Sequence, residues 1–582
     1  MPIGEITAGM VGEGTTVFTG LAREPFKAHI LGVLENITGP KHSLILARLE
    51  GGPLAHTGVI AGMSGSPVYI DGRLIGAVSY SLGSFSKEPI AGITPIDEMT
   101  DLATPATRPP ATRVAFELPL SHEGMARVLR QAFADSAFAS RSDRVREVGA
   151  QGLLPMATSL RPIATPIGVG GLSGEALDIL STFFRDTAFV PVGVAAGAAP
   201  FPAPTEPLRG GDAVGVGLVS GDLALGATGT VTLVEGSRVY AFGHPFFNLG
   251  PTSFPMTRAW VHTVLPSLNS SSKLATLGDV IGTIQQDRST AIGGTLGPGP
   301  TTIPVKVALE GSRGQRRAFE FSVVDDQIFT PLLTYISVLS VLQSFEREAG
   351  AATFEIKGEA KIKGHEAVSL EDIFAGDPPS IPTAAYVATP LMALLRNDRD
   401  PVEIENVNLT IVASEQPRTA TLERTWIDAP AIRPGRTVSL KMLTRSWRGD
   451  EQVRSLDVPI PSNARGPLTL LVLDGNRLAQ WEQREWRRAS NAQSVGQLIR
   501  AFNTARRNNR LYVRLLDQAQ GAVVDGEVMP SLPPSVMAVL APDRDSARAA
   551  LLRQAVVGEW ELPVGTAVVG SRTLTLNVEE NQ

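Results

Sequence analysis

Short apolar and β-branched runs, separated by glycine, proline and asparagine, fill the first hundred residues. The runs TTVFTG, FKAHILGVL, HSLILARLE and IAGITPI each have the length of a short strand. Two further runs, VYI and LIGAVSY, flank Asp71-Gly72, and this dipeptide between apolar runs is a strong hairpin signal. About six short strands at regular spacing predict a barrel or half-barrel within residues 1–105.

The next hundred residues show helical rather than strand periodicity. SHEGMARVLRQAFADSAF places its apolar residues on one helical face, and SGEALDILSTFFRD predicts a second helix with Ser173 as its N-cap. The run AAGAAPFPAPTEP that follows is typical of a linker. We therefore expect a helical insert and an Ala/Pro linker over residues 106–207.

The strand pattern returns after the linker. AVGVGLV, GTVTLVEGSRVYAFGH and TIPVKVAL predict strands within residues 208–350, and Thr330-Pro331 predicts the start of a helix. Alternating runs between residues 402 and 475 predict an immunoglobulin-like β-sandwich over residues 351–475. The remainder, residues 476–582, is expected to be an α+β region, whose arginines at 506, 507, 510 and 514 form a solvated face.

Composition narrows the class of protein. The chain has 582 residues, which is too many for one hydrophobic core, and its net charge of −6 argues against a nucleic-acid partner. No apolar run is long enough for a membrane span. Zero cysteines exclude disulfides, a thiol nucleophile and Cys-ligated zinc. No signal peptide is visible at the start, although the lack of cysteine fits an extracytoplasmic bacterial protein.

The strongest chemical signal is GMSGSP, residues 62–67. Glycine allows the backbone angles that push a neighbouring side chain out of a tight turn between strands. Ser64 is therefore the candidate nucleophile, and the N–H groups of Gly62 and Ser64 are candidate donors to an oxyanion. The plain alternative is a Gly/Ser-rich turn without chemistry.

A serine nucleophile needs a base, and the chain offers seven histidines. His244 differs from the others because it follows a strand and stands between a glycine and a proline, at a forced turn. We expect His244 to be the base; the alternative is a structural histidine. No HExxH motif and no phosphate-binding glycine loop is present, so no metal and no cofactor is expected.

Three segments carry a resemblance to the SpoIVB-type family of serine peptidases: GTVTLVEGSRVYAFGH, KLATLGDVIGTIQQDRSTAIGGTLG and TGVIAGMSGSPVYIDGRLIGAV. The resemblance covers roughly residues 5–100 and 208–325 and implies a trypsin-like double β-barrel. It makes His244 the base and Ser64 the nucleophile. The two halves stand in reverse order, so the resemblance also implies a circular permutation.

The same resemblance implies an acid seven residues before Thr57, which is Glu50, where the family has an aspartate. Asp287, in QQDR, is the alternative acid. These residues predict a mainly β, extracytoplasmic serine endopeptidase that acts on protein or peptide substrates, by limited proteolysis or on itself. The alternative from another class is a catalytically silent peptidase fold that serves as a binding or scaffold module.

Overall fold

The computed structural model describes most of the chain. The described residues are 1–82, 88–101, 160–184, 188–197, 206–311, 314–345, 351–397, 399–429, 431–486, 494–517, 521–524, 527–529, 535–536, 549–552 and 554–579. The helix expected around His122 and part of the expected linker lie outside them. The protein is mainly β, with 56% strand and 16% helix, as the sequence predicts.

The chain divides into two compact units. The described residues of the first unit fall within 1–305 and 320–340, and those of the second within 306–319 and 341–579. Three elements lie along the chain where it passes from one unit to the other. They are β16 (Thr302–Gly311), β17 (Arg316–Val324) and α6 (Phe329–Phe345).

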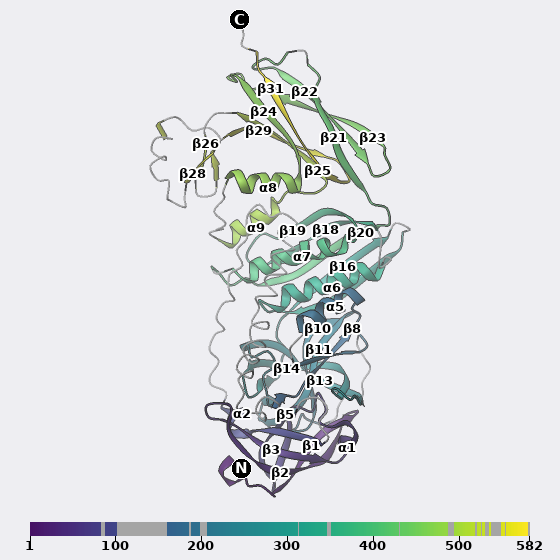
Figure 1. The fold of residues 1–582 in the computed structure, drawn as a ribbon, viewed down its shortest axis with the longest axis vertical. Helices are drawn as coiled ribbons and strands as arrows, with labels where there is room; N and C mark the ends of the chain where they lie inside the picture. Colours follow the sequence, from purple (N-terminus) through teal and green to yellow (C-terminus); the bar gives the residue numbers. More distant parts are fainter. Residues whose placement is uncertain are drawn as a thin grey trace, which may run out of the picture. The chain divides into compact units, whose positions relative to one another are not determined.

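A six-strand antiparallel β-barrel opens the first unit. The strand order is β1-β2-β3-β6-β5-β4, and the pairing of β4 with β1 closes the ring. Figure 1 labels β1, β2, β3 and β5 of this barrel near the N-terminus. Its strands are β1 (Val11–Thr19), β2 (Ala22–Gly39), β3 (His42–Glu50), β4 (Ser66–Ile70), β5 (Arg73–Leu82) and β6 (Ile90–Pro95). Three short helices accompany the barrel in the described residues: η1 (Ile3–Glu5), α1 (Leu54–Thr57) and α2 (Ile96–Thr100).

Local sequence signals explain the register of this barrel. Asp71 and Gly72 both have positive φ, at 49° and 74°, so the β4–β5 turn takes the tight geometry that Asp-Gly favours. The predicted hairpin is confirmed. Inward-facing aliphatic residues then form one core that includes Ile45, Val68 and Ile93.

A second ring of strand pairings follows in the same unit. Its order is β10-β13-β14-β15-β12-β11, and β11 pairs back with β10. If β10 to β15 are numbered 1 to 6 within this ring, the cyclic order of pairings is the same as in the first barrel: strand 1 pairs with strands 2 and 4 in both. Its strands are β10 (Ala213–Gly221), β11 (Ala224–Glu235), β12 (Arg238–Ala241), β13 (Gly250–Leu265), β14 (Ser272–Asp287) and β15 (Ile292–Leu296).

Between the two rings the chain forms a short β/α segment. It contains β7 (Leu160–Pro162), β8 (Thr165–Gly170), α5 (Gly174–Phe184) and β9 (Phe189–Gly193). The helix predicted over 173–186 is confirmed by α5. β7 extends the first barrel through β5, and β8 pairs with β11 of the second ring.

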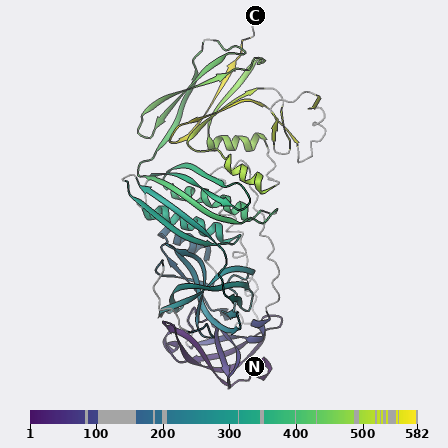
Figure 2. The same cartoon turned by 180° about the vertical axis from the view of Figure 1, so that it is seen from behind.

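The second unit begins with a sheet and two covering helices (Figure 2). β18 (Ala352–Ile362) lies between β19 (Val368–Gly376) and β20 (Ile404–Ser414). The helix α7 (Ser380–Leu395) packs against β19, together with α9 (Val495–Asn503). The first strand expected for the sandwich, within 402–412, is therefore β20 of this sheet.

Two four-stranded sheets, β23-β22-β21-β30 and β29-β25-β24-β31, share one apolar core in the second unit. This sandwich reaches well beyond residue 475, because its sheets take strands from the C-terminal region. The bounds are β21 (Thr419–Ile427), β22 (Thr437–Ser446), β23 (Glu451–Pro459), β24 (Pro467–Asp474), α8 (Gly475–Trp486), β25 (Arg510–Asp517), β26 (Gly521–Val524), β27 (Glu527–Met529), β28 (Ala549–Leu552), β29 (Ala555–Pro563), β30 (Ala567–Val569) and β31 (Ser571–Asn577).

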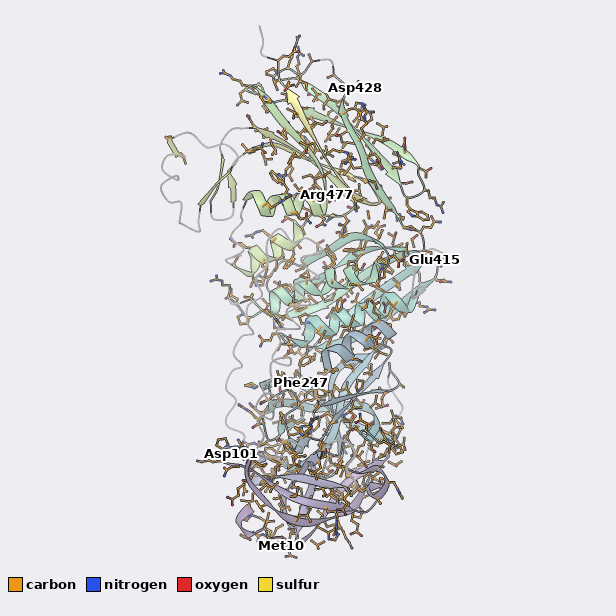
Figure 3. All side chains as sticks on the ribbon, viewed as in Figure 1. Met10, Asp101, Phe247, Glu415, Asp428 and Arg477 are labelled. Carbon is orange, nitrogen blue, oxygen red and sulfur yellow. The ribbon has the colours of Figure 1, made fainter. Side chains whose placement is uncertain are left out.

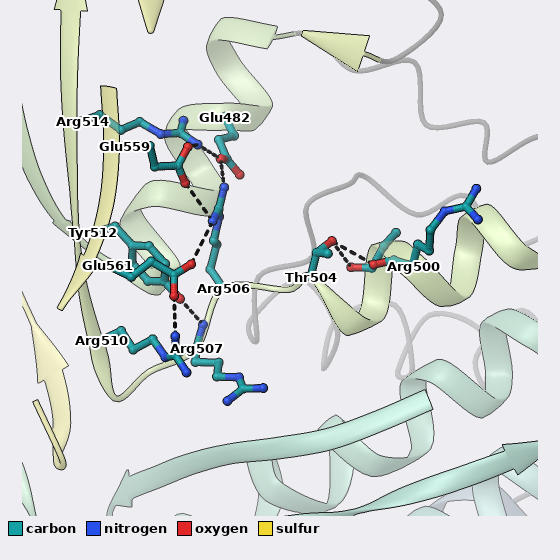
Figure 4. A network of polar contacts seen from close by, with 11 residues as sticks. Glu482, Arg500, Thr504, Arg506, Arg507, Arg510, Tyr512, Arg514, Glu559 and Glu561 are labelled. Atoms are coloured by element: carbon teal, nitrogen blue, oxygen red, sulfur yellow. Dashed lines mark hydrogen bonds and ion pairs between the residues drawn. The ribbon is translucent and has the colours of Figure 1, made fainter. Parts of the chain in front are cut away.

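The arginines after α9 do not form the solvated face that the sequence predicts. Arg506 contacts Glu482 at 2.7 Å and Glu559 at 3.0 Å, and the fully buried Arg514 bonds to the same two carboxylates (Figure 4). The carboxylates come from α8 and β29, which the sequence places far from these arginines. Such a compensated network holds α8 on the sandwich.

No helix in the described ranges has both the length and the apolar character needed to cross a membrane.

We predict that Glu482→Gln lowers the unfolding free energy by about 3 kcal/mol, because it removes one of the two carboxylates that Arg506 and Arg514 share and leaves excess positive charge buried. Urea unfolding of the full chain measures this change. The matched control is Glu403→Gln, which breaks the exposed pair between Lys363 and Glu403 and should leave the stability nearly unchanged. Equal effects of the two substitutions would contradict the role given to burial.

Candidate active site

Ser64 lies in a tight turn that precedes β4 of the first barrel. Gly62 and Gly65 flank it with φ of 92° and 95°, conformations that side chains other than glycine rarely adopt. The Met63 N–H donates to the Ile60 carbonyl at 3.1 Å, and the Gly65 N–H donates to the Val78 carbonyl at 2.8 Å. The turn is therefore fixed by its own backbone and by β5.

Two N–H groups of this turn have no acceptor. Within the described part of the chain, neither the Gly62 nor the Ser64 N–H donates a hydrogen bond, whereas those of Met63, Gly65 and Ser66 all do. Unpaired N–H groups on both sides of one residue can converge on a single oxygen atom. This is the property that an oxyanion-binding site requires.

The serine turn is attached to β11 of the second ring through backbone contacts. The Thr230 N–H donates to the Ser64 carbonyl at 2.9 Å, and the Thr232 hydroxyl donates to the Gly65 carbonyl at 2.7 Å. A Cβ at Gly65 would lie 1.9 Å from the Thr230 carbonyl oxygen and 2.5 Å from the Phe242 nitrogen. Only glycine permits this approach, so the turn and the second ring interlock here.

His244 lies in the corresponding turn of the second ring. β12, the third strand of that ring, ends at Ala241, and Phe242 and Gly243 then take positive φ of 72° and 70°. The Gly243 carbonyl accepts a hydrogen bond from the Thr94 hydroxyl of β6 at 2.7 Å. Ser64 likewise lies in the connection between the third and fourth strands of its own barrel, so the two residues come from equivalent connections of the two rings.

The tautomer of His244 follows from its hydrogen bond. Nδ1 lies 2.8 Å from the Pro245 carbonyl oxygen, which can only accept, so Nδ1 carries the proton and Nε2 carries the lone pair. Burial lowers the pKa of His244 to about 4, although the bond to Pro245 opposes the shift. The imidazole is therefore neutral at neutral pH, with a basic nitrogen available.

The reactive atoms of both side chains are buried and have no partner. Ser64 is 0% and His244 1% exposed, and neither Ser64 Oγ nor His244 Nε2 has a hydrogen-bond partner. Buried polar atoms are rarely left unpaired, and the exceptions occur at catalytic sites among other places. The described structure thus holds a free hydroxyl and a free imidazole nitrogen on two interlocked turns.

Asp287 lies at the end of β14, the fifth strand of the second ring, and holds the loop that follows His244. Its carboxylate accepts the N–H groups of Phe246 at 2.8 Å, Phe247 at 2.7 Å and Leu249 at 3.1 Å. Burial raises the pKa of Asp287 to about 6, although these N–H groups lower it. Asp287 fixes the loop that carries the Pro245 carbonyl and thereby orients His244.

Glu50, which the resemblance makes the acid, has a different partner. Its carboxylate lies 2.6 Å from Nε2 of His29 on the neighbouring strand β2, and its side chain is 65% exposed. Among the described residues no contact joins Glu50 to His244. The structure therefore places the Ser64 turn against the backbone at Phe242, two residues before His244, and Asp287 on the loop after His244, and it pairs Glu50 with another histidine. No hydrogen bond joins Ser64 Oγ to His244 Nε2.

An aromatic cluster packs around the loop after His244. Phe246 and Phe247 lie with ring centroids 5.5 and 4.7 Å from that of Phe189 on β9, and Phe247 lies 4.7 Å from Phe329 on α6 (Phe247 is labelled in Figure 3). Pro166 on β8 lies against Gly62. The segment between the two rings therefore packs on both turns.

Three polar residues that contact the two turns have no recognisable pattern in the sequence. Thr230 and Thr94 connect the turns, and the buried Lys273 lies below Gly62. Their partners are distant in the chain, and a lone threonine or lysine in an apolar run gives no signal of its own.

We predict that Asp287→Asn raises amide hydrogen exchange over residues 246–249, because an amide group can present its NH₂ to the backbone N–H donors that a carboxylate accepts. Glu50→Gln is the matched control and should leave exchange in this loop unchanged. Exchange of the full-length protein followed by mass spectrometry gives both results. An equal response to the two substitutions would contradict the assignment of Asp287.

Comparisons of the chain with models of protein families, with curated proteins and with solved structures find no match.

Proposed function

We propose that the chain is a serine endopeptidase of the SpoIVB type, in which Ser64 is the nucleophile and His244 the general base. The observation that carries the proposal is the pair of buried, unpartnered atoms, Ser64 Oγ and His244 Nε2, on equivalent turns of two interlocked rings. The shared strand order of the rings supports a trypsin-like double barrel.

The chemistry follows from these positions. Ser64 Oγ attacks the carbonyl carbon of the scissile peptide while His244 Nε2 takes its proton, and the N–H groups of Gly62 and Ser64 stabilise the oxyanion. The C–N bond then breaks, and the imidazolium returns the proton to the leaving amine. Water hydrolyses the acyl-enzyme by the same steps. Asp287 acts as a positioning residue through the loop after His244.

The reversed order of the two halves is compatible with this mechanism. Each ring supplies one residue from the connection between its third and fourth strands, and a catalytic arrangement depends on geometry rather than on chain order. We propose protein or peptide substrates and, from the resemblance, an extracytoplasmic location. The sandwich of the second unit would recognise or tether substrates.

A second candidate is a catalytically silent peptidase fold that serves as a binding or scaffold module. The burial of Ser64 and His244 favours it, because a substrate carbonyl must reach Ser64 Oγ. An active enzyme requires that the segment packed on the two turns, which includes Pro166 and Phe189, moves aside. Reaction with a small serine-directed probe separates the two candidates.

We predict that a fluorophosphonate probe labels the wild-type protein on Ser64. Ser64→Ala removes the labelled atom, and His244→Ala lowers the labelling rate by about 10⁶-fold, the scale found for the loss of a catalytic base. His29→Ala is the matched control, since His29 is a half-exposed histidine bonded to Glu50, and it should label normally. Absence of labelling in the wild type, with the protein folded, would favour the silent module.

We further predict that the labelling rate falls as pH falls through about 4, because protonation of His244 removes the lone pair that accepts the serine proton. Protonation of Asp287 near pH 6 weakens its hold on the loop and adds an earlier, partial loss, which Asp287→Asn abolishes. The measurement is the probe labelling rate between pH 3 and 8, at pH values where circular dichroism shows a folded protein. A rate independent of pH over this range would contradict the role of His244.

A further inference from the structure

Lys273 is a fully buried lysine at the start of β14, directly below the serine turn. Its Nζ lies 2.9 Å from the Thr16 hydroxyl of β1 and 3.3 Å from the Thr230 hydroxyl of β11. Its aliphatic chain lies against Gly62, and its own N–H donates to the Ala61 carbonyl at 3.0 Å. Lys273 thus contacts the first barrel, the second ring and the backbone that leads into the turn.

Thr230 links the amine of Lys273 to the serine turn by hydrogen bonds. Its hydroxyl donates to the Gly62 carbonyl at 3.0 Å, and its backbone N–H donates to the Ser64 carbonyl at 2.9 Å. The Gly62 carbonyl belongs to the peptide unit before Met63, and the Ser64 carbonyl belongs to the peptide unit after Ser64. A shift of Thr230 therefore changes the orientation of the N–H groups proposed to bind the oxyanion.

Proton counting shows which form of the amine fits this network. The Thr230 hydroxyl gives its proton to Gly62, so it can only accept from Nζ. Nζ donates to both the Thr16 and the Thr230 hydroxyl, and a neutral amine makes these two hydrogen bonds with its two N–H groups and carries no charge. An ammonium would instead place a charge among threonine hydroxyls, since in the described residues no charged side chain bonds to Nζ.

We propose that Lys273 is a positioning residue of the serine turn, and that its neutral amine holds the Gly62 and Ser64 backbone in the conformation that binds an oxyanion. The catalytic consequence of this inference rests on the proposed function. The hydrogen bonds that link Lys273 to the turn through Thr230 do not depend on it. Protonation of the amine would add a buried charge and a third N–H, for which the described residues provide no acceptor, and would loosen the turn. The reactivity of Ser64 would then decline on the acid side of neutrality.

A purely structural role makes a different prediction. A lysine that only joins the two rings affects overall stability, whereas a positioning lysine acts on the turn through the Thr230 hydroxyl. Thr230→Val removes this hydroxyl and keeps both Lys273 and the shape of the side chain. Thr230→Ser keeps the hydroxyl and is the rescue variant.

The first experiment is amide hydrogen exchange of the full chain at pH 8, followed on peptides that cover residues 60–66. Lys273→Met and Thr230→Val should each reduce protection there by about tenfold or more, because a buried acceptor loses its donor. Thr230→Ser and the surface control Lys27→Met should keep wild-type protection. Unchanged protection in Thr230→Val, or loss in Thr230→Ser equal to that in Thr230→Val, would overturn the proposal.

The second experiment follows pH. Burial lowers the pKa of Lys273 from 10.5 to about 7, so the folded protein binds fewer protons than the unfolded chain between these values. The stability of the wild type relative to Lys273→Met should therefore rise from pH 7 to pH 10. Probe labelling of the wild type should fall as pH drops through about 7, and Lys273→Met should lack this step.

The outcomes separate the two proposals. Loss of protection in Thr230→Val without any probe labelling of the wild type would retain the positioning role and reject the peptidase. Labelling of the wild type with the same pH dependence in Lys273→Met would retain the peptidase and reject the role of the neutral amine.

Discussion

The close approach of two backbones at Gly65 is the constraint on which the proposed site depends. The Thr230 carbonyl and the Phe242 nitrogen occupy the space that a Cβ at Gly65 would need. This approach places the serine turn of the first barrel directly on β11 and β12 of the second ring. His244 follows Phe242 by two residues, so the contact that seats Ser64 also determines where the histidine turn begins. A larger residue at position 65 would separate the two rings where they need to meet.

Burial at this contact has opposite effects on the groups around it. A dry environment disfavours charge, so it lowers the pKa values of His244 and Lys273 and raises that of Asp287. The imidazole and the amine are thereby kept neutral at a pH where an exposed lysine would be charged. The same dryness excludes water and substrate alike. Under the proposed function the site would have to open, and the segment around Pro166 and Phe189, which packs against Gly62 and Phe247, is the part that we expect to move.

Local signals in the sequence predict much of the fold. The strand His42–Glu50, the Asp71-Gly72 hairpin and the helix Gly174–Phe184 follow from periodicity and turn chemistry within a few residues. Ring closure cannot be predicted in this way, because it depends on pairings such as β10 with β13 between distant segments. The sandwich extends past its expected boundary for the same reason, since β25, β29 and β31 join it from the C-terminal region.

The residues of the candidate site likewise fall into those that local sequence patterns identify and those that they do not. Ser64 and His244 stand in distinctive local patterns, a glycine-flanked turn and a Gly-His-Pro sequence, and these patterns report backbone geometry directly. The residues that support them have no local pattern. Glu50 satisfies a spacing rule, yet it faces His29 because β2 and β3 pair with His29 opposite Arg48, two residues before Glu50. Asp287 satisfies no spacing rule but lies on the strand that closes behind the histidine loop. A residue that acts through backbone contacts can be recognised only once those contacts are known, and Lys273 is the clearest case, because its amine is defined by hydroxyls from two different rings.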